Sequence, residues 1–256
     1  MNKIELNDDE LLRYSRHILM PSVNIEGQLA ICNGRVLILG LGGLGSPVAL
    51  YLAAAGVGQF TLVDDDHVES SNLQRQIIHT QDTLACNKAE SAAQQMRKLN
   101  PSVNIDCVTQ RCDHEALQQL VNNCQVVVDC TDNFASRRLT NAVCYEARVP
   151  LVSGAAIRME GQLSTFDFRS AQSPCYECLY QLNGDENLSC SESGVLSPLV
   201  GVIGSAQALE VLKILAGFGK TLMGRLQLYD AALGSWREFS YRQDPNCPLC
   251  GSGSSL

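Results

Sequence analysis

The chain has 256 residues, 45% of them hydrophobic, which is enough for one large α/β domain or two small ones, and we expect a single domain with a small appendage. Its formal net charge of -8 argues against nucleic acid or an anionic membrane as a partner. No segment is typical of a membrane span or a secretory signal, so we expect a cytoplasmic protein without a membrane partner.

The first expected element is a helix from Asp8 to His17, with Asn7 as its N-cap and Glu10 as the capping-box partner. Beyond it, buried strand patterns alternate with helical ones, and this β-α-β-α order predicts a mostly parallel sheet with helices on both faces. The fold class is therefore α/β, a Rossmann-like doubly wound sheet. The expected strands are 35–40, 59–64, 103–109 and 125–130, and the expected helices are 43–55, 88–99, 114–121 and one that follows Asp132.

After Pro150 the pattern changes. Segments 150–157 and 161–168 predict two strands joined by a glycine turn, and segments 225–230 and 236–241 predict a second pair, which together give an antiparallel portion of the sheet. Between the pairs lie the polar, non-periodic segment 172–198 and an apolar, buried helix over 200–216. The last residues, GSGSSL, predict a flexible tail.

A glycine-rich turn follows the first buried strand. Gly40, Gly42 and Gly45 fit G-x-G-x-x-G between a strand and a helix, where backbone N–H groups at the helix N-terminus can bind phosphate. Asp64 closes the next strand about twenty residues later, where a carboxylate can accept hydrogen bonds from ribose hydroxyls. These features predict an adenine nucleotide but do not separate NAD from ATP.

Two cations and a further carboxylate favour a ligand with more phosphate charge than a dinucleotide. Arg75 and Lys88 follow the nucleotide turn, where a guanidinium binds phosphate oxygens bidentately and an ammonium acts as a point charge. Asp132 lies just past a buried strand, so it is expected at the same crevice, as a ligand of Mg²⁺ or as a helix cap. Asn133 competes for the role of cap, and Asp129 is expected to be structural.

Four cysteines form two C-x-x-C pairs, which predict a closed, structural zinc site that pins the C-terminus to the middle of the chain. These ligands are Cys175, Cys178, Cys247 and Cys250. A redox role for either pair is less favoured. Cys190 lies alone in a polar loop, Cys107, Cys130 and Cys144 are expected as small buried residues, and none of the four histidines is assigned a chemical role.

With these residues assembled, the sequence resembles the ubiquitin-activating-enzyme-like adenylyltransferases, in the bacterial branch that activates ubiquitin-fold sulfur carriers. The resemblance covers nearly the whole chain, and SGAAIRMEGQ is more similar to the molybdopterin-pathway members than to the thiamine-pathway members. It rests on both C-x-x-C pairs and on LLRYSRHIL, LGLGGLGSP, SNLQRQ, DCTDN, SGAAIRMEGQ and GVIGSAQALEVLK.

The family implies an ATP and Mg²⁺ site within a single domain over 1–256, with a nucleotide-binding half over about 30–150 and a carrier-binding and zinc half over about 151–250. Arg16 resembles the arginine that reaches the ATP of the neighbouring subunit, which implies a homodimer. Cys190 aligns with a cysteine that in some relatives bonds covalently to the carrier, a role that we treat as a hypothesis. The implied nucleotide and Mg²⁺ residues are Gly40, Gly42, Gly43, Asp64, Ser71, Asn72, Arg75, Lys88 and Asp132.

The resemblance also implies a reaction, in which the C-terminal glycine carboxylate of the carrier attacks the α-phosphorus of ATP and gives an acyl adenylate and pyrophosphate. The adenylate is later converted to a thiocarboxylate, with sulfur expected from a separate donor protein. The carrier tail is expected to pass 155–168 and the loop around Cys190. The alternatives are the same reaction on the thiamine-pathway carrier and, from another class, a nicotinamide-dependent oxidoreductase.

Overall fold

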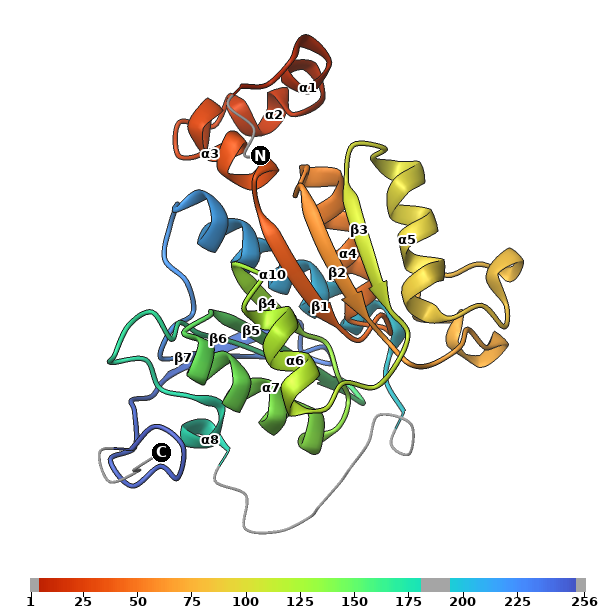
Figure 1. Cartoon of the computed structure of the whole chain (residues 1–256). Helices are drawn as coiled ribbons and strands as arrows, with labels where there is room; N and C mark the ends of the chain where they lie inside the picture. The colour runs from red at the N-terminus through yellow and green to blue at the C-terminus, as the bar shows by residue number, and fades with distance from the viewer. Residues whose placement is uncertain (1–4, 181–193, 252–256) are drawn as a thin grey trace.

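The computed structural model describes residues 5–180 and 194–251, and within them the strands form one 8-stranded sheet (Figure 1). The strand order across the sheet is β3-β2-β1-β4-β5-β6-β7-β8. The strands are β1 (Arg35–Leu39), β2 (Gln59–Val63), β3 (Asn104–Val108), β4 (Val126–Asp129), β5 (Leu151–Ile157), β6 (Glu160–Phe166), β7 (Arg225–Asp230) and β8 (Ser235–Ser240).

The sheet has a parallel part and an antiparallel part. Strands β3, β2, β1, β4 and β5 pair in parallel, as expected when a helix connects one strand to the next. A tight turn at Arg158 and Met159 reverses the chain between β5 and β6, so β5 to β8 pair antiparallel. The predicted α/β fold, mostly parallel with an antiparallel portion, is therefore confirmed.

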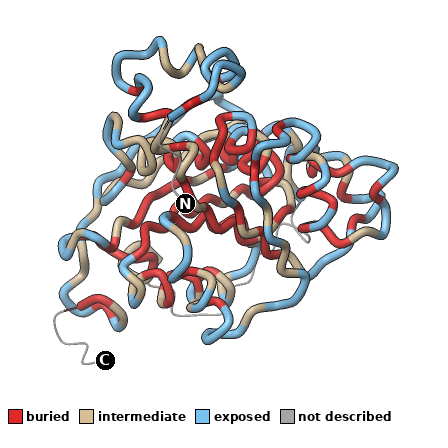
Figure 2. Tube along the Cα trace, turned by 45° about the horizontal axis from the view of Figure 1, so that its top comes forward, coloured by how far each residue is buried: buried red, intermediate tan, exposed pale blue. Residues whose placement is uncertain are grey.

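Helices cover both faces of the parallel part, because the residues of each strand point alternately to opposite sides. In β1, Val36 and Ile38 pack into one hydrophobic cluster with α3, α4, α5 and α10, whereas Leu37 and Leu39 pack into the other with α6, α7 and α8. Figure 2 shows the buried strands at the centre of the molecule. These helices are α3 (Asn24–Cys32), α4 (Gly45–Ala55), α5 (Lys88–Leu99), α6 (His114–Val121), α7 (Phe134–Ala147), α8 (Tyr176–Leu179) and α10 (Ser197–Ala216).

The N-terminal helix begins as predicted but is interrupted. Asn7 caps α1 (Asp8–Arg13) in a capping box with Glu10, and the chain bends at Tyr14 before α2 (Ser15–Ile18). Tyr14 is buried, and its hydroxyl accepts a hydrogen bond of 3.0 Å from Asn100 Nδ2. The single helix over 8–17 was therefore a wrong prediction, because a tertiary contact of one side chain outweighs the continuous helical pattern.

Four smaller differences concern helix boundaries, a missed helix and burial. The helix after the glycine turn begins at Gly45 rather than Gly43, helix α3 was not predicted, and α10 begins three residues early at Ser197. Cys107 is only half-buried because it lies in β3, the edge strand of the sheet, whereas Cys130 and Cys144 are buried as expected. Helix α10 is long and apolar enough to cross a bilayer by composition, and its apolar residues pack here against α3, α4, β5 and β6.

Candidate functional site

A cavity of about 480 Å³ opens at the carboxyl ends of β1, β2 and β4. The strand order reverses between β1 and β4, and such a reversal is where open α/β sheets bind ligands. The cavity brings together most of the residues predicted from the sequence. Those that line it are Gly40, Gly42, Gly43, Asp64, Arg75, Lys88 and Asp132.

The glycine turn has no room for side chains at two of its positions. Gly40 has φ +87, and a Cβ there would lie 2.9 Å from the carbonyl oxygen of Cys130. A Cβ on Gly45 would lie 2.0 Å from the carbonyl oxygen of Gly40. The turn therefore packs closely against the end of β4 and against the start of α4. The N-terminal end of α4 faces the cavity.

Asp64 holds the glycine turn as well as facing the cavity. Its Oδ2 accepts a hydrogen bond of 2.7 Å from the backbone N–H of Leu41, and its Oδ1 accepts one of 2.9 Å from that of Asp66. Burial raises the pKa of Asp64, and these two hydrogen bonds oppose that rise. A carboxylate oxygen accepts more than one hydrogen bond, so Asp64 retains capacity for ribose hydroxyls.

His79 supports this site without lining the cavity, and the sequence did not predict it. It is buried, with Nε2 2.9 Å from the carbonyl oxygen of Leu41 and Nδ1 2.8 Å from Ser91 Oγ. The carbonyl only accepts, so Nε2 carries the proton and Nδ1 accepts from the serine hydroxyl. Burial lowers the pKa of His79, which keeps the ring neutral beside Lys88.

The two predicted cations have partners within the chain. Lys88 Nζ lies 2.9 Å from Asp66 Oδ2, with the lysine side chain only 9% exposed and the aspartate side chain 71% exposed. Arg75 donates through Nη1 to the carbonyl oxygen of Ser71 over 3.2 Å. Both partners would compete only weakly with a phosphate for these cations, because Asp66 is solvated and the Ser71 carbonyl is neutral.

Ser71 and Asn72 do not line the cavity. The Ser71 hydroxyl donates to Glu69 over 3.2 Å, and Asn72 is buried where its Oδ1 accepts from the Glu69 N–H over 3.3 Å. In this structure they organise the short 3-10 helix Ser70–Asn72 that carries Arg75 to the cavity. Their predicted contact with the nucleotide stays a prediction.

Asp132 presents a carboxylate that the fold leaves unused. Asn133 is the N-cap of α7, with its Oδ1 accepting from the Ser136 N–H over 2.9 Å, so the competition for this cap is settled in favour of asparagine. Within the described part of the chain, Asp132 is exposed and makes no hydrogen bond or ion pair. Asp129 is buried and bonded to Thr131 and Ser153, as expected for a structural residue.

Arg16 lies far from this cavity. It is exposed on α2, and Figure 1 shows helices α1 to α3 beyond the amino ends of the strands, whereas the cavity lies at the carboxyl ends. Within one chain, Arg16 therefore does not reach the nucleotide turn.

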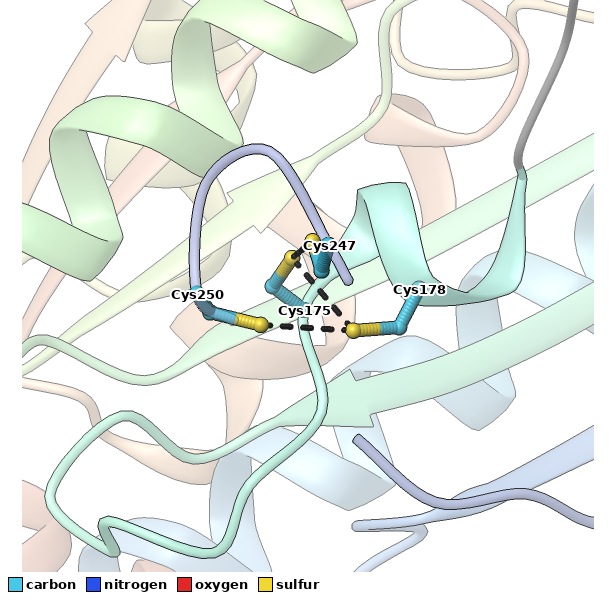
Figure 3. Close-up of side chains that lie close together, drawn as sticks. All are labelled: Cys175, Cys178, Cys247 and Cys250. Carbon is cyan, nitrogen blue, oxygen red and sulfur yellow. Dashed lines mark hydrogen bonds between the residues drawn. The ribbon is translucent and has the colours of Figure 1, made fainter. Parts of the chain in front are cut away.

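The four predicted cysteine ligands form one cluster (Figure 3). Their Sγ atoms lie within 4.8 Å of one another, with 3.9 Å from Cys175 to Cys178, 3.5 Å from Cys175 to Cys247 and 3.3 Å from Cys178 to Cys250. A tetrahedron with Zn–S bonds of about 2.3 Å has S···S edges of roughly 3.8 Å, so the cluster fits zinc. Cys190 lies outside the described residues.

The close approach of the four sulfurs changes the pKa values of their thiols. A hydrogen bond with Cys175 lowers the pKa of Cys178 to about 5, and burial raises the pKa of Cys250 to about 12. Without a metal, the cluster therefore favours one thiolate and three thiols. The neighbouring thiols stabilise the first thiolate, and its negative charge opposes the ionisation of a second. A zinc ion would allow all four to ionise.

Comparison with known proteins identifies the family. The ThiF family model matches residues 14–249, which is most of the chain. The chain belongs to the ThiF family. It is 48% identical to the molybdopterin-synthase adenylyltransferases of Salmonella typhimurium strain LT2 and Escherichia coli strain K12, over 96% of this chain and 99% of each relative. It is 42% identical to the sulfur carrier protein ThiS adenylyltransferase of E. coli strain K12, over 98% of this chain and 99% of that one.

Solved structures with less sequence similarity share the fold of this ThiF-family chain. E. coli MccB crystallised with ATP has a TM-score of 0.82 at 23% identity, covering 93% of this chain and 74% of that one. PaaA has a TM-score of 0.81 at 22% identity, covering 95% of this chain and 77% of that one. The family model and the curated relatives confirm the predicted family resemblance and the prediction of an adenylyltransferase enzyme.

Proposed function

We propose that this chain adenylylates the C-terminal glycine of a ubiquitin-fold sulfur carrier, the small subunit of molybdopterin synthase, in molybdenum cofactor biosynthesis. The single observation that carries the proposal is the composition of the cavity. A glycine turn, a ribose-facing carboxylate, two cations and an unused carboxylate line one space of about 480 Å³. The 48% identity to two molybdopterin-synthase adenylyltransferases supports the choice of pathway.

The proposed chemistry needs charge neutralisation rather than a base. A C-terminal carboxylate is already ionised at neutral pH, so it attacks the α-phosphorus without losing a proton. The barrier comes from bringing this anion to a triphosphate. Arg75 and Lys88 would bind the phosphates, Lys88 leaving its solvated partner Asp66, and removing one such group would cost about 3 kcal/mol, roughly a hundredfold in rate.

Asp132 is the residue that would hold Mg²⁺. Its carboxylate is exposed at the rim of the cavity and is bonded to nothing else in the described chain, and hard cations prefer such oxygen ligands. The ion, when bound, would neutralise phosphate charge in the transition state. Zinc at the four cysteines would be structural, since four thiolates leave no open position.

The carrier tail would reach the α-phosphate along the antiparallel part of the sheet. Ala156 of β5 and Val195 line the cavity, and Val195 forms a parallel bridge with Arg158 at the β5–β6 turn. The tail would therefore enter beside 155–168, while the loop around Cys190, the other part of its predicted path, lies outside the described residues. Sulfur would come from a separate donor protein, and the enzyme would act in the cytoplasm.

Arg16 would act across a homodimer, because it lies beyond the opposite ends of the strands from the cavity of its own chain. Exposed apolar side chains lie just after α2 and on α10, among them Leu19 at 71% and Leu209 at 49% exposure. A second copy of the chain would cover such surfaces.

A mixing experiment tests the shared site. Arg16→Ala and Asp132→Ala proteins, each inactive alone, should regain about a quarter of the wild-type activity when equal amounts are unfolded and refolded together. About half of the dimers are then mixed, and each mixed two-fold dimer carries one intact site of two. Arg13→Ala is the matched control, an exposed arginine of α1 bonded to the Leu99 carbonyl, and it should stay active alone. Absence of recovery in a mixture shown to contain heterodimers would refute the arrangement.

ATP–pyrophosphate exchange tests the function itself. Exchange that requires the molybdopterin-pathway carrier supports the proposal. Exchange only with the thiamine-pathway carrier would move the chain to the alternative pathway with the same chemistry, an alternative that rests on the 42% identity to ThiS adenylyltransferase. Nucleotide binding without exchange on either carrier would contradict adenylylation.

A further inference from the structure

Thr131, the residue before Asp132, has every polar group fixed by a buried partner. Its N–H and its hydroxyl donate to Asp129 Oδ1 over 3.0 and 2.7 Å. Its carbonyl oxygen accepts a hydrogen bond from Nη2 of Arg137. With Asn133 fixed as the cap of α7, the backbone on both sides of Asp132 is held while the carboxylate itself stays free.

Arg137 connects this turn to the cysteine cluster. It lies in the first turn of α7, is 7% exposed and lines the cavity. Its guanidinium also interacts with the phenol of Tyr176, the residue that follows Cys175 and begins α8. Arg137 is thus hydrogen-bonded to the turn that presents Asp132 and interacts with the helix that carries Cys178.

The cysteine cluster is firmly attached to α7. The N–H of Tyr176 donates to Asn141 Oδ1 over 2.9 Å, and Glu177 pairs with Arg138 at 3.3 Å. Tyr176 is almost fully buried and packs against Tyr180 with ring centroids 4.5 Å apart. The position of the Tyr176 hydroxyl is therefore set by the cluster and by α7 together.

We propose that Arg137 is a positioning residue through which the four-cysteine cluster fixes the turn that carries Asp132. The inference rests on the proposed function, because it takes Asp132 as the Mg²⁺ ligand. Arginine suits the task since its fork of five N–H donors can serve the Tyr176 hydroxyl and the Thr131 carbonyl at once, which a lysine ammonium on a flexible stem does not. Misplacing a metal ligand of this kind costs about 10- to 100-fold in metal affinity.

The test measures affinity for a fluorescent ATP analogue with Mg²⁺ and with EDTA, and requires no carrier. Arg137→Lys keeps the charge beside Asp129, and Tyr176→Phe removes only the hydroxyl. In EDTA, both variants should bind the analogue as tightly as wild type does. In Mg²⁺, both should bind it about tenfold more weakly than wild type. Arg138→Lys is the control, because Arg138 contacts the same helix through Glu177 but does not line the cavity, and it should behave as wild type.

A double-mutant comparison separates positioning from direct contact. In an Asp132→Asn background, Arg137→Lys should have no further effect, because the residue through which it acts is already gone. Equal losses in EDTA and in Mg²⁺ would mean that Arg137 touches the nucleotide itself, and would overturn the proposal. So would a wild-type response to Mg²⁺ in both Arg137→Lys and Tyr176→Phe.

The two proposals can fail separately. If neither carrier supports exchange while the Mg²⁺ response of Arg137→Lys is reduced, the adenylylation is wrong and the positioning role stands. If exchange proceeds but the Mg²⁺ response is unchanged in both variants, the positioning role alone is wrong. Should Arg137→Lys not fold, Tyr176→Phe carries the same test.

Discussion

Both backbone polar groups of Leu41 are held by hydrogen bonds. Its N–H donates to Asp64 and its carbonyl accepts from His79, and both partners come from other elements of the fold. The turn that would bind phosphate is thus in place before the ligand arrives, which saves the cost of reorganising dipoles during the reaction. His79 does not line the cavity and would act by holding a backbone carbonyl.

The pH dependence of stability tests the neutral state of His79. Burial lowers its pKa in the folded chain below the ordinary value of 6.5, so the unfolded chain binds the extra proton first as pH falls. Its contribution to the free energy of unfolding is therefore fully present above pH 6.5 and is lost as pH falls toward the lowered value. We expect His79→Gln, measured by urea unfolding between pH 5 and pH 8, to lack this loss, whereas parallel curves for variant and wild type would contradict it.

At the scale of single residues, some roles could be predicted from the sequence and others could not. Asp132 and Asn133 were both candidates for the N-cap of α7. Asn133 is the cap, because its side chain accepts a hydrogen bond from the N–H of Ser136, three residues later. His79 and Arg137 could not be predicted, because their partners Leu41 and Tyr176 lie 38 and 39 residues away and no local pattern marks such contacts. Both are buried polar groups whose bonds depend on the assembled fold.

At the scale of elements, α10 and α4 cross closely at one glycine. A Cβ on Gly204 would lie 2.5 Å from the Leu44 carbonyl oxygen, next to the glycine turn, while nothing lies within 4 Å of a Cβ on Gly201, three residues earlier. The two positions share a helix and differ only in what they face.

These two glycines should respond oppositely to alanine. Gly204→Ala should destabilise the fold by about 1–3 kcal/mol, because a backbone carbonyl cannot yield without moving α4. Gly201→Ala should stabilise it by up to about 1 kcal/mol through helix propensity. Chemical denaturation of both variants is the measurement, and a Gly204→Ala protein as stable as wild type would show that the helices separate at little cost.

Elements with strong local signals were predicted to the residue. Helix α5 begins after the cap Asn87 and helix α6 after the cap Asp113, and their bounds Lys88–Leu99 and His114–Val121 match the predictions. Helix α3 was missed although Asn24 at its start, with φ 53, accepts a hydrogen bond from the Gly27 N–H over 3.1 Å, an N-cap pattern that we did not recognise in the sequence. The break at Tyr14 was missed for a different reason, because the contact of Tyr14 is with Asn100, just after α5, and no local pattern marks it.

At the scale of the whole molecule, zinc binding should depend on pH. Most of the four sulfurs must lose a proton to bind the metal, with Cys250 starting from a pKa of about 12 and Cys178 from about 5. Competition with a chromogenic chelator should therefore show weaker zinc affinity at pH 6 than at pH 8. Cys247→Ser should lower both the zinc content and the thermal midpoint, while Cys86→Ser, outside the cluster, should keep one zinc ion per chain.

The cysteine cluster also changes how the chain can come apart. Cys175 and Cys247 are 72 residues apart, and α10, β7 and β8 all lie between them. With a metal bound, this stretch is a closed loop rather than a free end, so the outer strands gain less chain entropy when they separate from the sheet starting at β8. Metal binding should therefore slow fraying of the antiparallel edge, where the carrier would dock.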